Sequence, residues 1–231
     1  MLPCAILCGG LATRLRPITE KIPKSLVPIA DEPFLAHQLR LLRTGGINEA
    51  VLCVGHLGEQ IRAFAGDGRQ FGMKISYSFD GARLLGTAGA IRKALPFLPE
   101  SFFVLYGDSY LPCDYAAVAE VFSAARKRGL MTIYRNEGHY DTSNVHAKDG
   151  VILRYDKRNK TPEMQFIDYG LGVFQRSVFL ELPAGEVVDL ADVYQNLLKA
   201  EDLACYEVKQ RFYEIGSEEG IRDLEQYIGQ A

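Results

Sequence analysis

The chain has 231 residues, of which 48% are apolar and 24% are charged, a composition that is typical of a globular protein and argues against intrinsic disorder. Its 26 Lys and Arg residues against 29 Asp and Glu residues give a net charge of -3, which argues against nucleic acid or an anionic membrane as the main partner. No apolar run approaches the ~18–20 residues needed to cross a bilayer.

The N-terminal residues and the cysteines predict a cytoplasmic protein. Residues 1–8 carry no basic leader and run at once into a glycine pair, which indicates a first strand instead of a signal peptide. The five cysteines are scattered and lie mostly in apolar runs, so we interpret them as reduced, packed thiols. Reduced thiols are typical of the cytoplasm.

In chain order, short apolar runs alternate with helical patterns through the first half. The runs are compact and aliphatic or aromatic, which predicts buried parallel strands at 3–8, 50–54, 74–79 and 102–106. Helical spacing of apolar residues lies between them, at 34–43, 57–65 and 87–95. This alternation predicts an α/β fold with a Rossmann-like, doubly wound and mostly parallel sheet.

The second half has a different pattern. A helix is predicted at 115–127, a strand at 131–134, and strands with turn signals between them from about 143 to 174. Two further helices are expected at 190–199 and 218–228. We interpret this half as an antiparallel lobe added to the parallel sheet, within a single domain that spans 1–231.

The loops after the first, third and fourth strands are the places to look for a site, because ligands bind beyond the carboxyl ends of parallel strands. The first of these loops carries Gly9-Gly10, then Arg14 and Lys24. Paired glycines let backbone N–H groups approach anionic oxygens, and the two cations suit phosphate. Taken alone, the two glycines are more typical of an ordinary tight turn, with both cations in solvent. Neither the P-loop motif nor the dinucleotide fingerprint is present.

The same loop resembles the signature G-G-x-G-T-R-L, followed about ten residues later by P-K, of the sugar-1-phosphate nucleotidyltransferases. The matching residues are Gly9-Gly10-Leu11-Ala12-Thr13-Arg14-Leu15 and Pro23-Lys24. Ala12 replaces the third glycine of the motif. The resemblance implies an enzyme that transfers a nucleoside monophosphate from a nucleoside triphosphate to a sugar 1-phosphate and releases pyrophosphate.

The resemblance implies roles for residues of the first half, 1–112, as the nucleotide-binding half. Arg14 would hold the triphosphate and the leaving pyrophosphate, and Lys24 would act at the α-phosphate. A turn similar to the family's base-recognition turn lies at 85–90. The nucleotide-binding residues implied are Leu7, Gly9, Gly10, Thr13, Gly86, Thr87 and Gly89.

The second half, 113–231, would bind the sugar phosphate. Asp156-Lys157 is similar to a Glu-Lys pair whose acid holds sugar hydroxyls and whose lysine is the catalytic group at the sugar phosphate. Asp168-Tyr169-Gly170 falls where the family has Asn-x-Gly, which also faces the sugar. Ser143, Asp156, Lys157, Asp168 and Gly170 are therefore predicted to bind the sugar phosphate, although by themselves such residues are usually surface groups in turns.

Two carboxylates are implied as ligands of Mg2+. Tyr106-Gly107-Asp108 resembles the family's G-D, in which the aspartate is catalytic and binds the metal. Residues 212–217 resemble the block W-x-D-[IT]-G-T, but Glu214 stands in place of its aspartate. Glutamate adds ~1.5 Å of reach, so its backbone must lie further from the metal or a water must intervene.

The substrates are left open between several alternatives. The turn at 85–89 is most similar to that of mannose- and heptose-1-phosphate guanylyltransferases, which favours GTP. A cytidylyltransferase for a non-sugar phosphate such as phosphocholine, or a catalytically silent nucleotide-sensing module, remain as alternatives. Nucleic acid and membrane are not expected as partners, and the family's frequent dimers make a homodimer a hypothesis.

Overall fold

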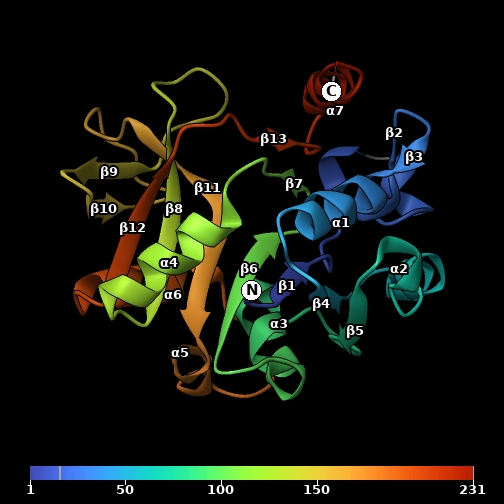
Figure 1. Cartoon of the computed structure of the whole chain (residues 1–231), viewed down its shortest axis with the longest axis horizontal. Coiled ribbons are helices and arrows are strands. Elements are labelled where there is room, and N and C mark those ends of the chain that lie inside the picture. The colour runs from blue at the N-terminus through green and yellow to red at the C-terminus, as the bar shows by residue number, and fades with distance from the viewer. Residues whose placement is uncertain (16, 231) are drawn as a thin grey trace.

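The computed structural model describes residues 1–15 and 17–230, and its centre is a nine-stranded sheet (Figure 1). The strand order is β10-β9-β11-β6-β1-β4-β5, and β8 pairs with both β11 and β12 beside this path. The strands are β1 Cys4–Leu7, β4 Glu49–Val54, β5 Lys74–Phe79, β6 Ser101–Tyr106, β8 Gly129–Arg135, β9 Val145–Lys148, β10 Val151–Tyr155, β11 Phe166–Gln175 and β12 Leu203–Val208.

The parallel half of the sheet confirms the predicted fold class. β1 pairs in parallel with β4 on one side and with β6 on the other, and β4 pairs in parallel with β5. Each of the four predicted strand ranges differs from the observed one by no more than one residue at either end. β1, β4 and β6 are buried on both faces, which is why they appear in the sequence as continuous apolar runs, whereas β5 lies at the edge of the sheet and is only partly buried.

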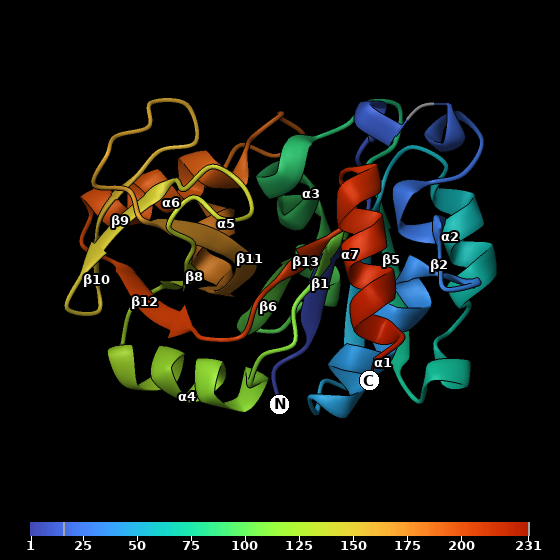
Figure 2. The same cartoon turned by 90° about the horizontal axis from the view of Figure 1, so that it is seen from above.

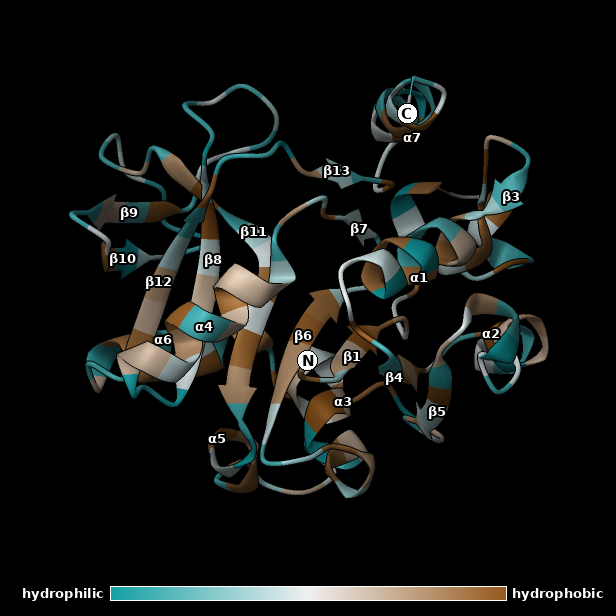
Figure 3. Ribbon diagram, in the orientation of Figure 1, coloured by the Kyte–Doolittle hydropathy of each residue, from teal (hydrophilic) through white to brown (hydrophobic). Residues whose placement is uncertain are grey.

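Helices cover both faces of the sheet, as the doubly wound prediction requires (Figure 2). They are α1 Phe34–Thr44, α2 Gly58–Ala65, α3 Gly86–Ala94, α4 Tyr115–Ala125, α5 Arg176–Leu180 and α6 Leu190–Lys199, whereas α7 Glu218–Ile228 packs against the short strands β2 Pro28–Ile29 and β13 Tyr213–Glu214. One hydrophobic cluster packs α1, α2 and α4 against the sheet, and a second packs α3, α5 and α6 against its other face. Figure 3 shows the apolar residues concentrated in central strands such as β1 and β6.

The second half forms the predicted antiparallel lobe. β11 runs antiparallel to β6 and to β8, and β9 and β10 form an antiparallel pair. Two features were not predicted: β12 pairs in parallel with β8, and the short helix α5 follows β11. The division of function between residues 1–112 and 113–231 stays a prediction.

Short elements complete the chain. β7 Ser109–Tyr110 pairs with β13 Tyr213–Glu214, and β2 Pro28–Ile29 pairs with β3 Glu32–Pro33. The 3-10 helices are Thr13–Leu15, Ile18–Glu20, Lys24–Leu26, Arg69–Phe71 and Leu95–Phe97. None of the helices in the described ranges is long and apolar enough to cross a bilayer.

Gly172 in β11 provides a test of how α6 packs against the sheet. A Cβ at this position would lie 2.2 Å from the Tyr194 hydroxyl oxygen and 2.7 Å from Phe174 Cε2. We predict that Gly172→Ala lowers the free energy of unfolding by about 1–3 kcal/mol, because overpacked cores cost this much. Urea unfolding would measure the loss, and adding Tyr194→Phe should recover part of it. An unchanged unfolding midpoint in Gly172→Ala would contradict this packing.

Candidate functional site

A cleft of about 410 Å³ opens at the carboxyl ends of β1 and β6. Its walls come from the loops after β1, β5 and β6 and from Gly216, which follows β13. These include the three loops that the sequence selected. The predicted site residues that line it are Leu7, Gly9, Gly10, Thr13, Arg14, Lys24, Gly86, Thr87 and Asp108.

The glycine loop leaves β1 at Gly9, which has little room for a side chain. A Cβ on Gly9 would lie 3.2 Å from the backbone nitrogen of Gly55, whereas one on Gly10 would meet nothing within 4 Å. Ala12, where the family motif has glycine, adopts φ +47°, a region that glycine enters without strain. Its carbonyl accepts hydrogen bonds from Leu15 N at 3.1 Å and Thr19 Oγ1 at 2.8 Å, which fix this conformation.

Lys24 and Asp108 form an ion pair inside the cleft. Lys24 Nζ donates to Asp108 Oδ2 at 2.7 Å across 84 residues of sequence. The turn that carries Asp108 is held from behind by Gln38 of α1, which is fully buried. Gln38 Nε2 donates to Tyr106 O at 3.1 Å and to Ser109 O at 2.7 Å. This role was not predicted, because in the sequence Gln38 is only one position in the helical pattern of residues 34–43.

Glu214, from the C-terminal part of the chain, lies beside the turn that carries Asp108. β13 pairs with β7 so that Glu214 lies opposite Ser109, and Ile215 N donates to Asp108 O at 3.0 Å. Glu214 Oε2 accepts from Gly216 N at 3.1 Å, so the longer side chain folds back toward its own backbone. Burial raises the pKa of Glu214, and nearby Asp108 raises it further while Lys24 and Arg14 oppose the shift.

The carboxylates at the cleft could hold a divalent cation only together with other ligands. Within the described residues, no group of three or more His, Cys, Asp or Glu side chains could hold a metal ion by itself. Asp108, in the turn before β7, and Glu214, in β13 beside β7, nevertheless supply two carboxylates. This set suits Mg2+, which usually takes one or two carboxylates and completes its shell with phosphate oxygens and water.

The start of α3 is packed against the segment before α6. Gly86 has φ +71°, and a Cβ there would lie 2.6 Å from Val188 O. Ala88 N and Gly89 N both donate to Val188 O, at 2.9 and 3.3 Å. Gly89 faces this segment as well, because its Cβ would lie 2.5 Å from Glu186 O. Gly89 does not line the cleft, and its nucleotide-binding role stays a prediction.

Asp80 also lines the cleft and was not identified from the sequence. Its side chain is buried beside the glycine loop, and Leu85 N donates to its Oδ2 at 3.2 Å. Burial raises the pKa of this carboxyl group. The available signal was its position, one residue beyond strand β5.

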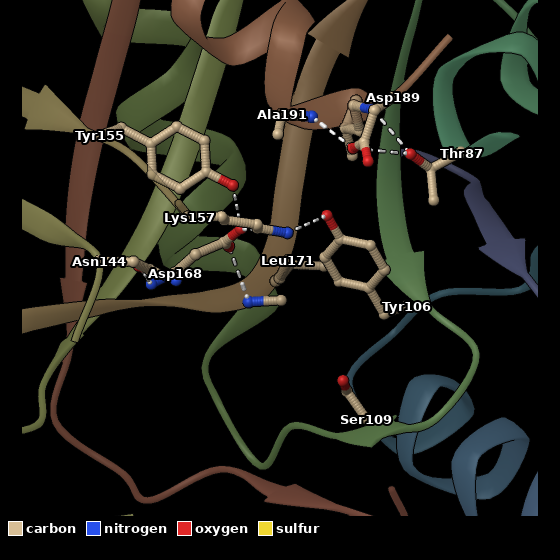
Figure 4. A network of polar contacts seen from close by, with 12 residues as sticks. Thr87, Tyr106, Ser109, Asn144, Tyr155, Lys157, Asp168, Leu171, Asp189 and Ala191 are labelled. Atoms are coloured by element: carbon tan, nitrogen blue, oxygen red, sulfur yellow. Dashed lines mark hydrogen bonds and ion pairs between the residues drawn. The ribbon is translucent and has the colours of Figure 1, made fainter. Parts of the chain in front are cut away.

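A network of polar side chains adjoins the cleft on the side of the second lobe (Figure 4). Lys157 Nζ donates to the Tyr106 hydroxyl oxygen at 3.2 Å and lies 3.9 Å from Asp168 Oδ2. Asp168 accepts from Gly170 N at 3.1 Å and from the Tyr155 hydroxyl at 3.3 Å. Tyr106 lines the cleft, so it connects this network, with the predicted Lys157, Asp168 and Gly170, to the cleft.

Two predicted sugar-binding residues make other contacts. Asp156 Oδ1 accepts from the backbone nitrogens of Arg158 and Asn159, both at 2.8 Å, and these bonds lower its pKa. Ser143 accepts from Asn136 Nδ2 at 3.1 Å and lines a separate surface hollow. These contacts give no support to a sugar-binding role for either residue, which stays a prediction.

Comparison with known proteins agrees with the motifs. A model of the nucleotidyl transferase family matches residues 4–230. UTP–glucose-1-phosphate uridylyltransferase of Synechocystis is 31% identical over 226 residues, which cover 90% of this chain and 58% of that protein. D-glycero-alpha-D-manno-heptose 1-phosphate guanylyltransferase of Campylobacter jejuni is 33% identical over 202 residues, covering 87% of this chain and 88% of that protein. The chain thus spans less than two thirds of the first relative and most of the second.

Solved structures share the fold. HddC from Yersinia pseudotuberculosis, complexed with GMP-PN, has a TM-score of 0.82 at 21% identity and covers 99% of this chain and 100% of its own. The relatives differ in the base and the sugar that their names give. Because the family model covers almost the whole chain, this protein belongs to the nucleotidyl transferase family of enzymes, and its relatives are sugar-1-phosphate nucleotidyltransferases.

Proposed function

We propose that this protein transfers a nucleoside monophosphate from a nucleoside triphosphate to a sugar 1-phosphate and releases pyrophosphate. The observation that carries the proposal is that one cleft collects Arg14, Lys24 and Asp108, with Glu214 beside Asp108. Lys157 adjoins the same cleft through Tyr106. The free thiols of all five cysteines support the expectation that it acts in the cytoplasm. A homodimer stays a hypothesis.

Charge neutralisation is the chemical task of such a site. Two unit charges ~4 Å apart cost about 4 kcal/mol at an effective dielectric of ~20, and a triphosphate that meets a monophosphate multiplies this repulsion. The attacking phosphate oxygen is already an anion at neutral pH, so the reaction needs no general base. In-line displacement at the α-phosphorus then depends on positioning and on nearby cations.

Each cation of the site has a distinct place in this proposal. Arg14, on the glycine loop, would bind the triphosphate and the departing pyrophosphate. Lys24 would bind the α-phosphate, and its pairing with Asp108 keeps its ammonium group inside the cleft. Lys157 would bind the phosphate of the sugar substrate. Asp108 and Glu214 would hold Mg2+, which would supply further positive charge to the reacting phosphates.

The nucleotide preference that we propose is GTP. Of the cations that line the cleft, Lys24 pairs with Asp108, and both Lys24 and Arg14 act on the neighbouring Glu214. The Asp80 carboxylate would repel phosphate, so we place the base on the Asp80 side of the cleft. Guanine presents adjacent N1–H and N2–H donors that a carboxylate can accept together, whereas uracil and thymine present one N–H between two carbonyl oxygens. The Campylobacter guanylyltransferase supports the same preference and a mannose- or heptose-type sugar.

The network around Lys157 favours a sugar over choline. A quaternary ammonium ligand needs free aromatic faces. In this network the Lys157 ammonium itself lies 5.0 Å from the centroid of the Tyr106 ring. A second cation would be repelled there, so we favour a sugar phosphate over phosphocholine.

Lys24→Ala or Asp108→Asn should lower turnover by about 10²–10³-fold, the size found when one preorganised group that stabilises developing charge is removed. Pyrophosphate release with GTP and α-D-mannose 1-phosphate, α-D-glucose 1-phosphate or N-acetyl-α-D-glucosamine 1-phosphate would measure it. Lys74→Ala, which removes an exposed lysine paired with Glu49, serves as the control. Near-normal turnover in either cleft variant would remove that residue from the mechanism.

Glu214→Gln keeps the size of the side chain and removes its charge. We predict that the Mg2+ concentration for half-maximal rate rises by at least about tenfold, since even the loss of an outer-shell partner costs ~10–100-fold in metal affinity. Glu214→Asp keeps the charge and should retain a Mg2+ response close to that of the wild type. Equal Mg2+ dependence of Glu214→Gln and wild type would show that Glu214 is not a ligand.

Asp80→Asn tests the nucleotide preference. The wild type should use GTP better than UTP, CTP, dTTP or ATP, and the variant should lose about tenfold or more in kcat/KM for GTP, as expected for one good bidentate base contact. Its kcat/KM for the other triphosphates should change little. A uniform loss across all five, or a wild-type preference for UTP or dTTP, would contradict the assignment of Asp80 to guanine.

A further inference from the structure

Lys157 and Tyr106 come from separate parts of the sheet and meet beside the cleft (Figure 4). Lys157 follows β10, which lies at one edge of the sheet, whereas Tyr106 is the last residue of the central strand β6. The Tyr106 hydroxyl oxygen is 3.2 Å from Lys157 Nζ. This hydroxyl is the contact that places an ammonium group from the edge of the sheet beside the cleft.

The other neighbour of Lys157 is a carboxylate that stays just out of hydrogen-bonding range. Asp168 Oδ2 lies 3.9 Å from Nζ, beyond the ~2.7–3.2 Å of an N–H···O hydrogen bond. Asp168 is fixed where it is, because its side chain is 4% exposed and Gly170 N and the Tyr155 hydroxyl donate to it. The Lys157 side chain, by contrast, is 40% exposed and has a flexible stem.

We propose that Tyr106 is a positioning residue, whose hydroxyl keeps the Lys157 ammonium from closing onto Asp168 and so leaves it free to bind the phosphate of the second substrate. An ammonium has three N–H donors; Tyr106 takes one, and the separation from Asp168 leaves the charge only partly compensated. The inference rests on the proposed function, because it assigns Lys157 to the sugar phosphate.

The ionisation of both partners supports this arrangement. Burial raises the pKa of Tyr106, so the hydroxyl stays neutral near pH 7 and acts as an acceptor for Lys157. Burial opposes the charged form of Lys157, but Tyr106 and Asp168 more than offset this, and the pKa of Lys157 is raised. Without the hydroxyl, the charged ammonium would form a direct ion pair with Asp168 at ~2.7–2.9 Å.

Tyr106→Phe tests the proposal, because it removes the hydroxyl and keeps the ring that lines the cleft. The probe is whichever of α-D-mannose, α-D-glucose or N-acetyl-α-D-glucosamine 1-phosphate gives the fastest pyrophosphate release with the wild type. We expect KM for this sugar phosphate to rise about tenfold, as for loss of one hydrogen bond to a charged group. KM for the nucleotide should change less than about twofold, within the scatter of independent sites.

A double-mutant cycle distinguishes positioning from a merely structural role. In a Lys157→Met background, Tyr106→Phe should change kcat/KM for the sugar phosphate by less than about twofold. The reason is that the hydroxyl acts on the Lys157 ammonium, which this background lacks. Tyr77→Phe is the matched control, since its hydroxyl donates to Gly66 O at 2.6 Å, outside this network. It should leave both KM values unchanged. The unfolding midpoint of each variant is measured alongside.

Three results would overturn the proposal. The first is an equal rise of both KM values in Tyr106→Phe. The second is the same fold-change from Tyr106→Phe with and without Lys157. The third is a crystal structure of Tyr106→Phe in which Lys157 Nζ keeps its distance from Asp168. If the wild type releases no pyrophosphate with any of the sugar phosphates, the proposed function itself fails, and this result differs from the other three.

Discussion

The ion pair between Lys24 and Asp108 is the contact around which the rest of the site is arranged. It spans 2.7 Å and joins the loop after β1 to the turn after β6. These two turns are adjacent because β1 and β6 are paired in parallel, with Leu7 opposite Tyr106. Opposite charges are thus already in place where like-charged substrates are proposed to meet. Removal of either partner would leave the other uncompensated in a partly buried position.

The surrounding structure fixes the Asp108 turn and positions two further charged side chains, Glu214 and Arg14. Gln38 of α1 binds the backbone on both sides of Asp108. β13 lays Glu214 along β7, next to the same turn. The glycine loop holds Arg14 within a 3-10 helix that follows the strained Ala12. Preorganised groups of this kind need little rearrangement when charge develops during a reaction.

β6 is also the strand at which the two halves join. β11 runs antiparallel to it, with Leu171 opposite Leu105, and Tyr106 at its end contacts Lys157. A rigid shared strand would hold a nucleotide and a sugar phosphate in fixed relative positions. Such positioning can supply a large share of the rate enhancement in a two-substrate reaction.

The sequence predicted the parallel strands well, because a continuous apolar run indicates a buried strand whichever elements pack beside it. It also predicted Arg14, Lys24 and Asp108 as cleft residues, since ligand sites form at the carboxyl ends of such strands. Gln38 and Asp80 were not found, because their roles depend on what packs against them. Asp156 and Lys157 show the limit of motif reading. They are neighbours in sequence, yet turn hydrogen bonds occupy Asp156 while Lys157 reaches Tyr106.

The most direct test of the account is a crystal structure of the protein with a non-hydrolysable GTP analogue and Mg2+. The account predicts the α-phosphate within hydrogen-bonding distance of Lys24, the outer phosphates at Arg14, and the metal between Asp108 and Glu214. A nucleotide whose phosphates lie away from Arg14 and Lys24, or a metal bound by neither carboxylate, would contradict it.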